Sequence, residues 1–343
     1  MTTQPQSPLT MLLSRHTRRR EFIKLLGGAA AAWPLAARAQ QPAMPVIGFL
    51  SSGQPQVFAH MIDAFRQGLN ETGYVAGQNV TFEHRAAGSE YDRFRAMADD
   101  LVRRQVALIF ATGGTAAALA ARTATSTIPI VFYMGGDPVQ QGLVASLSRP
   151  GGNLTGFGWL GFALAAKRLE LLRELLPNGA TIGMLMNPAN PDSDFEMRDV
   201  QDAARILGRQ IHILTASSDG EFDGVFATLV KQQVAALIVA SDAYFSGRRG
   251  RIVALAARHG VATIYERREF PDAGGLISYG HHRSDAYRQL GIYAGRILKG
   301  TKPAELPVLQ PTKFELVINL NAAKALGIEI SPKLLALSDE VIE

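Results

Sequence analysis

The stretch that decides the fold is "ALIFATGG", Ala107–Gly114, because it has a second copy, "ALIVASDA", Ala236–Ala243, 129 positions later. Each copy is a short apolar run that ends in small and hydroxyl residues, as a buried strand does when it reaches a loop. Two more pairs keep the same order at offsets of 135 and 133 positions: "VIGFLSSG" (46–53) with "TIGMLMNP" (181–188), and "IPIVFY" (128–133) with "VATIYE" (261–266). The repeat predicts two similar lobes built from the same strands.

Helical patterns separate these strands. Between the first two strand-like runs, for example, Phe58, Met61, Ile62, Phe65 and Leu69 recur at helical spacing. Strands that alternate with helices are typical of a parallel sheet with helices on both faces. We therefore predict an α/β protein of two doubly wound parallel-sheet lobes.

The segments between the repeats predict several crossings from one lobe to the other. Gly-rich sequence at 148–161 marks the first crossing, and breaks near Gly280 and after Gly300 mark two more, which together form a multi-crossing hinge. The predicted division is 1–39 as a signal peptide, 40–157 plus 281–305 as lobe 1, and 158–280 plus 306–343 as lobe 2.

The N-terminus reads as an export signal. Arg19 and Arg20 lead into an apolar run, Leu25–Ala37, that is too short to span a membrane, and Ala37 and Ala39 supply a cleavage pattern before Gln40. A flexible basic tail is the alternative. We expect a twin-arginine-type signal peptide, cleavage near Ala39 and a periplasmic protein that is not itself membrane-spanning.

Charge and cysteine content narrow the function classes. The chain has 35 Lys and Arg against 30 Asp and Glu, but residues 1–39 hold six of the basic residues and one of the acidic residues, so the rest carries 29 of each. A net charge of zero lacks the basic footprint of a nucleic-acid binder. With no cysteine, the chain has no disulfide, thiolate metal site or thiol nucleophile.

In open α/β sheets, ligands bind beyond the carboxyl ends of the strands. Two facing lobes bring both sets of strand ends to one cleft, where we expect a small solute to bind. The candidate ligand-binding residues are Ser51, Ser52, Thr112, Gly113, Gly114, Thr115, Tyr133, Asp137 and Trp159 from the first half and Asn187, Ser241, Asp242, Tyr244, Glu266 and Tyr279 from the second.

The Gly pair in "ATGG" suits an anion. Thr115 begins a small-residue helix, and the N–H groups of a helix N-terminus attract a carboxylate or a phosphate. No Gly-Lys-Ser/Thr sequence supports a P-loop. In the alternative, Gly113 and Gly114 only turn the chain and Thr115 caps the helix.

An amino acid would suit the polar and aromatic side chains at the other strand ends. Asp137 or Asp242 would take its ammonium group, and Tyr133, Trp159, Tyr244 or Tyr279 would wall its side chain. Alternatively, each of these aromatic residues lies in the core or at the rim of the cleft and does not contact the ligand. Asp137 also has an alternative, as the N-cap of a short helix that begins at Pro138.

Catalytic motifs are weak or missing. "GFGWLG" (156–161) satisfies G-x-G-x-x-G, but the following strand ends in Asn187 instead of the acidic residue that holds a ribose. We found no nucleophile elbow, S-x-x-K or H-E-x-x-H. His281 and His282 read as a surface loop pair, and Asp192 as a charge that favours a helix start. We expect no enzyme and no cofactor, with an exported nucleotide-dependent oxidoreductase as the alternative.

Six segments carry a family resemblance. They are "MPVIGFL", "DLVRRQVALIFATGGTAAALAA", "GGDPVQQGLVASLSRPGGNLTG", "AAKRLELLRELLP", "REFPDAGGLISYG" and "KPAELPVLQPTKFELVINLNAAKALGI". With these, nearly all of the chain after residue 39 resembles the type I periplasmic substrate-binding proteins of ABC transporters, in the group of tryptophan and aromatic amino-acid binding proteins.

The resemblance implies two lobes that close on a small solute and then dock on a membrane permease. It implies that Ser51, Ser52 and the stretch from Thr112 to Thr115 hold the acid group of the solute. It also implies that the facing side of the cleft is lined by Asp137, Asn187, Asp242 and Tyr244. A sensor-type module that presents the solute to a receptor would share this cleft.

Overall fold

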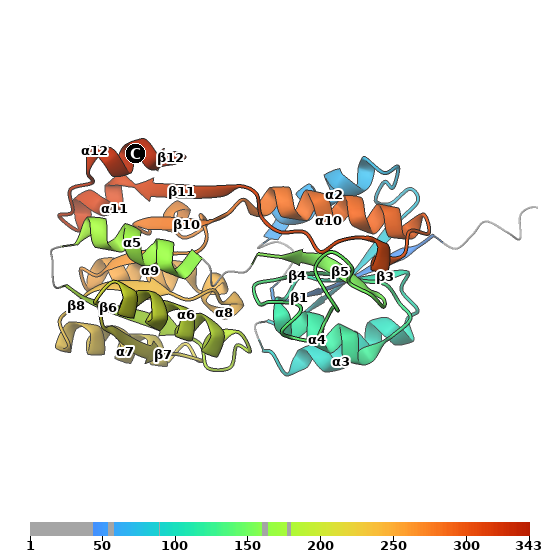
Figure 1. Ribbon diagram of the computed structural model, residues 1–343, viewed down its shortest axis with the longest axis horizontal. Coiled ribbons are helices and arrows are strands. Elements are labelled where there is room, and N and C mark those ends of the chain that lie inside the picture. Colours follow the sequence, from blue (N-terminus) through green and yellow to red (C-terminus); the bar gives the residue numbers. More distant parts are fainter. Residues whose placement is uncertain (1–43, 54–57, 89, 160–163, 177–179) are drawn as a thin grey trace, which may run out of the picture. The chain divides into compact units, whose positions relative to one another are not determined.

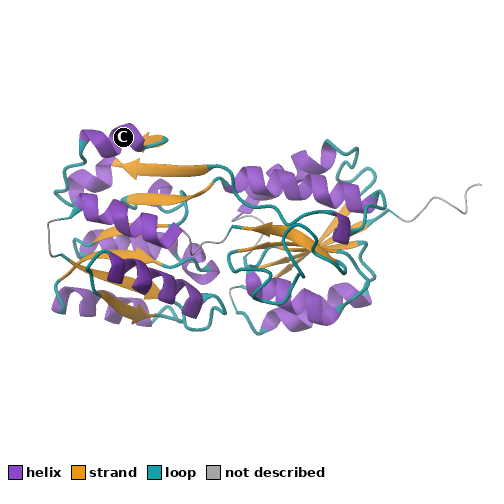
Figure 2. Ribbon diagram, in the orientation of Figure 1, coloured by secondary structure: helices purple, strands orange, loops and turns teal. Residues whose placement is uncertain are grey.

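Two β-sheets carry the strand repeat (Figures 1 and 2). The computed structural model describes residues 44–343 except for 54–57, 89, 160–163 and 177–179, so the predicted signal peptide lies outside the described residues. The first sheet has the order β2-β1-β3-β4-β5, and the second has β12-β11-β10-β9-β8-β6-β7. Strands β6 to β10 therefore repeat the order of β1 to β5, and the prediction of two similar α/β lobes is confirmed.

The elements follow the predicted alternation. From the first half these are β1 (Val46–Ser51), α2 (Ala59–Asn70), β2 (Thr81–Ala86), α3 (Arg93–Arg103), β3 (Leu108–Ala111), α4 (Thr115–Ala124), β4 (Ile130–Met134) and β5 (Leu154–Gly158). The second half begins with α5 (Ala165–Leu175), β6 (Thr181–Met186), α6 (Ser193–Ile206), β7 (Ile211–Thr215), α7 (Glu221–Lys231), β8 (Val234–Val239), α8 (Ala243–Gly247), α9 (Arg249–Arg258), β9 (Ala262–Tyr265), η4 (Pro271–Ala273) and β10 (Ile277–His281). The chain ends with α10 (Arg283–Leu298), η5 (Pro303–Glu305), β11 (Phe314–Asn319), α11 (Leu320–Ala325), α12 (Pro332–Leu337) and β12 (Glu340–Ile342).

One strand pair departs from the predicted parallel sheets. All pairs of the first sheet are parallel, but β10 and β11 of the second sheet are antiparallel. The reason is the path of the chain. After β10 it leaves the second sheet to form α10, and it returns at the same strand ends, so β11 has to run in the opposite direction.

Helix α10 packs against elements of the first half of the chain although it directly follows the second sheet. It lies beside α2 (Figure 1), and Ala286 and Leu290 share one buried cluster with Phe65 and Leu69. Gly291 makes this close approach possible, because a Cβ atom there would collide with the α2 backbone. Farther along the chain, the backbone of Leu309 forms an isolated parallel β-bridge with Phe157 of β5. The lobe boundaries stay a prediction, and we propose that the third crossing follows Leu309.

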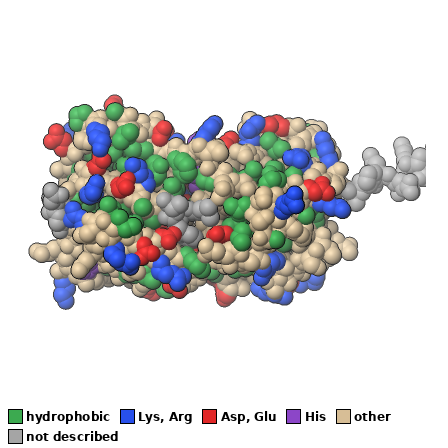
Figure 3. Space-filling model, viewed as in Figure 1, with side chains coloured by type: hydrophobic (Ala, Val, Ile, Leu, Met, Phe, Trp, Pro, Cys, Tyr) green, Lys and Arg blue, Asp and Glu red, His purple; other side chains and the backbone are tan. Residues whose placement is uncertain are grey.

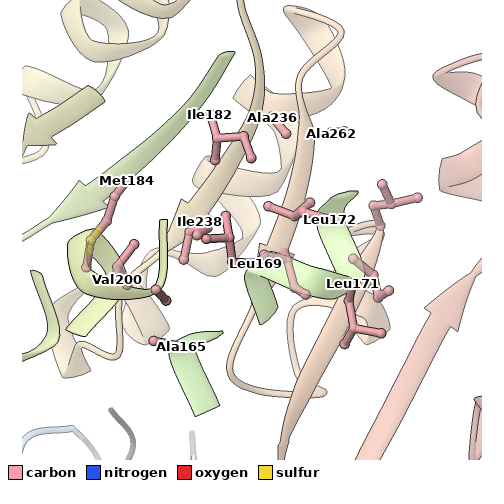
Figure 4. Packing of buried hydrophobic residues seen from close by; sticks show 14 of the residues in the cluster. Ala165, Leu169, Leu171, Leu172, Ile182, Met184, Val200, Ala236, Ile238 and Ala262 are labelled. Atoms are coloured by element: carbon pink, nitrogen blue, oxygen red, sulfur yellow. The ribbon is translucent and has the colours of Figure 1, made fainter. Parts of the chain in front are cut away.

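The second lobe has its main core between the sheet and helices α5 and α6 (Figure 4). Leu169 and Leu172 of α5 pack there with Ile182 of β6, Ile238 of β8 and Val200 of α6. Burial of a Leu or Ile side chain stabilises a fold by about 1.5 to 3 kcal/mol. This packing holds the ends of β6 and β8 in place at the site described next.

Candidate functional site

A cavity lies at the carboxyl ends of the strands. Its empty space, counted together with the part open to solvent, amounts to about 770 Å³. In each sheet the strand order reverses between the first and third strand of the repeat, which is where ligands bind in open α/β sheets. Ten predicted residues line the cavity: Ser51, Ser52, Thr112, Gly113, Gly114, Thr115, Tyr133, Trp159, Ser241 and Asp242.

The N-terminus of α4 faces this cavity without a cap of its own. Gly114 is the N-cap residue, with a φ of 78° that favours glycine, and no side chain caps the helix or adds an acidic charge to its first turn. The alternative in which Thr115 caps α4 is wrong, since its hydroxyl has no hydrogen-bond partner of good geometry among the described residues. The first-turn N–H groups and the helix dipole can therefore attract a carboxylate.

Asp242 is a buried carboxylate with all its bonds made. Its Oδ1 accepts a hydrogen bond from the Phe245 N–H at 3.0 Å. Its Oδ2 accepts from the Tyr91 hydroxyl at 2.7 Å and from Asn187 Nδ2 at 3.3 Å. Burial raises the pKa of Asp242, and these donors oppose that shift. Asp242 is thus held by its neighbours, one of which, Tyr91, comes from the other half of the repeat.

Asp192 is the less satisfied carboxylate. It is 8% exposed, and its Oδ1 lacks a hydrogen-bond partner of good geometry within the described part of the chain. Burial raises its pKa to about 6, the charge of Asp242 adds to the rise, and the Thr115 hydroxyl opposes it. Asp192 Oδ1 and Thr115 Oγ1 both lie next to Gly136, because a Cβ atom added there would be 2.6 Å from the first and 3.0 Å from the second. Thr115 begins α4, so the unpaired carboxylate oxygen of Asp192 lies beside the N-terminus of that helix. Asp192 is the N-cap residue of α6, as its interpretation as a helix-start charge predicts, but its side chain makes no capping hydrogen bond and lines the cavity.

Aromatic rings and arginines line another part of the cavity. The Tyr133 ring lies 4.4 Å from Trp159 and 4.9 Å from Tyr287. Arg283 donates to the Tyr133 hydroxyl at 3.2 Å and pairs with Glu269 at 2.6 Å. Tyr133 and Trp159 were expected as ligand walls, whereas the arginines had no signal in the sequence pattern.

His281 corrects a prediction. It lies on β10, is 3% exposed, and its Nε2 is 2.7 Å from the Tyr133 hydroxyl, so it is no surface loop residue. Burial lowers its pKa to about 3, which keeps the ring neutral. His282 is the N-cap of α10.

Five predicted residues do not line the cavity. Asp137 accepts hydrogen bonds from the N–H groups of Val139 and Gln140, which form a turn instead of the expected short helix. The Tyr244 hydroxyl donates to Asp219, and the Tyr279 ring stacks on Phe314.

The other two, Asn187 and Glu266, contact lining residues: Asn187 donates to Asp242, and Glu266 lies 3.5 Å from Arg267. Both are buried. The sequence pattern located the strand ends but not the direction in which each side chain points.

The "GFGWLG" motif has a packing role in its described part. Gly156 and Gly158 lie within β5, and a Cβ on Gly156 would collide with the Phe132 carbonyl on β4. These glycines therefore belong to a strand and not to a loop that opens a helix. Gly161 lies outside the described residues.

Surface charge shows no basic patch on the face drawn in Figure 3, where acidic and basic side chains are interspersed. In the part of the chain that the structure describes, no helix has the length and apolar character needed to cross a bilayer.

Comparison with known proteins identifies the family of this chain. The sequence model of the family described as ABC transporter substrate binding protein matches residues 54–342. A curated relative, the tyrosine-binding protein of Clostridioides difficile, is 27% identical over 269 residues, which cover 77% of this chain and 76% of the relative.

Two solved structures are similar. One, the ABC domain in complex with L-Trp from Streptococcus pneumonia, has a TM-score of 0.79 and 25% identity, and the match covers 88% of this chain and 100% of that one. The other, a conserved domain protein from Vibrio cholerae, has a TM-score of 0.81 and 24% identity over 87% of this chain and 99% of that one. The chain therefore belongs to the ABC transporter substrate binding protein family.

Proposed function

We propose that this protein is the periplasmic component of an ABC importer, which binds an α-amino acid in the cavity and delivers it to a membrane permease. The binding step needs no covalent chemistry and no cofactor. Its mechanism is a shift in population, because a solute that contacts both halves of the cavity favours the conformation in which they face each other.

The proposal of an amino-acid ligand rests on the position of Asp192 next to the α4 N-terminus. The two charged groups of an α-amino acid sit on one carbon atom, so its site needs an anion binder and a cation binder side by side. The uncapped helix end and the Thr115 hydroxyl suit the carboxylate, and Asp192 Oδ1 suits the ammonium group. Asp242 would hold neighbouring residues of the site in position instead of binding the ligand, since its oxygens already accept hydrogen bonds from the protein.

The comparisons support the ligand class and the role. The relative from Clostridioides difficile is described as tyrosine-binding, and the structure from Streptococcus pneumonia holds L-Trp. Membership of the family supports a permease partner. Together with the signal-like N-terminus, it also supports export to the periplasm.

Calorimetric titration of the purified protein tests the amino-acid site. We expect saturable binding of an L-amino acid, and affinity at least about tenfold weaker for its analogues without the α-amino or α-carboxyl group, because each loses a charge-assisted hydrogen bond. Asp192→Asn should weaken the binding of the amino acid by a similar factor and leave the affinity for the amine-free analogue unchanged.

Asp194→Asn is the matched control, since Asp194 lies exposed in the first turn of α6, two residues after the N-cap Asp192. It should bind like the wild type. Equal affinity for the amino acid and its amine-free analogue would contradict the proposed role of Asp192.

A further inference from the structure

We propose that His281 couples the cavity to the hinge, because its ring contacts the chain where it passes between the two sheets and also holds Tyr133, a residue of the cavity wall. In this role His281 is a positioning residue that does not touch the ligand. The inference rests on the proposed function only where it concerns ligand affinity, since the hinge itself can be tested without a ligand.

His281 packs against the first predicted crossing. Its ring stacks on Trp159 at 5.2 Å and on Phe157 at 5.7 Å, as distances between ring centroids. Phe157 belongs to β5, the edge strand of the first sheet, and Trp159 directly follows that strand, whereas His281 is the last residue of β10 in the second sheet. Stacked rings favour one relative arrangement over others. The end of β10 is therefore packed onto the end of β5.

The third predicted crossing passes the same place. The Leu309 N–H donates to the Gly156 carbonyl at 2.8 Å, and the Leu309 carbonyl accepts from the Gly158 N–H at 3.0 Å, so this segment is bonded to β5. Farther on, the Lys313 carbonyl accepts a hydrogen bond from the His282 N–H at 3.2 Å. All three predicted crossings thus come together around the end of β10. Hinge movements are absorbed at a few such residues at the ends of elements.

A hydrogen bond joins His281 to the cavity wall. Its Nε2 lies 2.7 Å from the hydroxyl of Tyr133 on β4, and Arg283 Nε donates to the same hydroxyl at 3.2 Å. Because a guanidinium can only donate, the hydroxyl oxygen accepts from Arg283 and its proton is free to be donated to His281 Nε2. Burial lowers the pKa of His281 to about 3, so the ring is neutral and Nε2 can accept this bond. We therefore expect the tautomer of His281 that carries its proton on Nδ1.

Tyr133 extends this connection into the cavity. It lines the cavity, and its ring contacts Trp159 and Tyr287, which line the cavity as well. His281 is buried and is not among the described residues that line the cavity. The bond between them joins a strand of the first sheet to a strand of the second. A change at His281 that alters ligand affinity therefore acts through Tyr133 or through the hinge.

A double-mutant cycle on ligand affinity tests this coupling, with L-tyrosine as the probe in calorimetric titration of the purified protein. His281→Leu removes the bond, and we expect about fivefold to tenfold weaker binding, the effect of one lost hydrogen bond. In the Tyr133→Phe background the same change should weaken binding less than about twofold, because the bond is already absent. His281→Gln can still bond to the Tyr133 hydroxyl through its amide and should bind within about twofold of the wild type.

His282→Asn is the matched control. His282 is the next residue in the chain, is exposed and caps α10 with its side chain, a role that Asn can take over. This variant should bind L-tyrosine like the wild type.

Two measurements test the hinge without a ligand. NMR of the imidazole nitrogens should show the Nδ1–H tautomer of His281 at neutral pH. Small-angle X-ray scattering should give His281→Leu a larger radius of gyration than the wild type and His281→Gln, because the two sheets lose a bond that holds them face to face. Tyr133→Phe removes the same bond from the other side and serves this comparison if His281→Leu does not fold.

Three results would overturn the proposal. Wild-type affinity together with wild-type scattering for His281→Leu would show that the ring does not hold the hinge. Equal weakening of binding in His281→Gln and His281→Leu would assign the effect to ring packing instead of the hydrogen bond. An Nε2–H tautomer would refute the assigned direction of that bond. Loss of compactness in His281→Leu without any binding of L-tyrosine to the wild type would instead support the hinge role and count against the proposed function.

Discussion

Asp192→Asn should stabilise the ligand-free protein, although the same change weakens its ligand binding. Asp192 is 8% exposed, and none of the residues that the structure describes gives its Oδ1 a hydrogen bond of good geometry. An ionised carboxylate in that position is costly, and an amide of the same shape carries no charge to desolvate.

The magnitude follows from the pKa of the carboxyl group. Folding raises it from 3.8 to about 6, so between these values the folded protein binds more protons than the unfolded chain. Stability therefore falls as the pH rises through this window, and the loss is complete above it. At about 1.36 kcal/mol per pKa unit, ionised Asp192 lowers the free energy of unfolding by about 3 kcal/mol at pH 8 and by about half of that at pH 5.

Urea unfolding of both proteins at pH 8 and pH 5, without ligand, measures this difference. We expect the Asn variant to be more stable by up to about 3 kcal/mol at pH 8, with the gain roughly halved at pH 5. Asp194→Asn should show no such gain, since Asp194 is exposed. An Asn variant that is less stable than the wild type at pH 8 would refute the reasoning, because Asp192 would then have bonds that stabilise its charge.

Two further changes test the packing and the cross-lobe contact. Gly291→Ala should lower the free energy of unfolding by about 1 to 3 kcal/mol, because the new methyl group collides with α2. Gly224→Ala, on the open face of α7, should instead raise the free energy of unfolding by about 0.5 to 1 kcal/mol. Urea unfolding measures both changes. Tyr91→Phe should weaken ligand affinity about fivefold to tenfold in calorimetric titration, because Asp242 loses its donor from the other lobe at 2.7 Å; unchanged affinity would show that this bond does not stabilise the ligand-binding conformation.

Much of the fold could be predicted because strands and helices leave periodic signals. The pairs at nearly constant offset located β1, β3, β4, β6, β8 and β9, and the structure gives these strands the same order in both sheets. The antiparallel β11 could not be predicted in this way, since its direction depends on where the chain returns after α10 and not on its own residues.

The site was harder to predict than the fold. Strand ends gave Thr115 and Asp242, since chain order alone places them at the carboxyl edge of a sheet. Tyr91, Arg267 and Arg283 line the cavity from loops and from the start of a helix, where no periodic pattern fixes the direction of a side chain. A signal for Tyr91 would have needed the arrangement of the two lobes, because its partner lies 151 positions away.

The two carboxylates of the cavity explain how one site can be both organised and ready to bind. Asp242 has donors on both oxygens, and the one from Tyr91 joins the two halves of the repeat before any ligand is present. In the proposed mechanism, this bond stabilises part of the ligand-binding conformation, so less of the ligand's binding free energy is needed to close the lobes. Asp192 has the opposite effect, because its ionised, unpaired oxygen destabilises the empty protein above its pKa, and a cationic group of a ligand would remove that cost. In the same mechanism, a solute without a cationic group would close the lobes but leave this cost in place, so we expect the difference between the two carboxylates to contribute to selectivity.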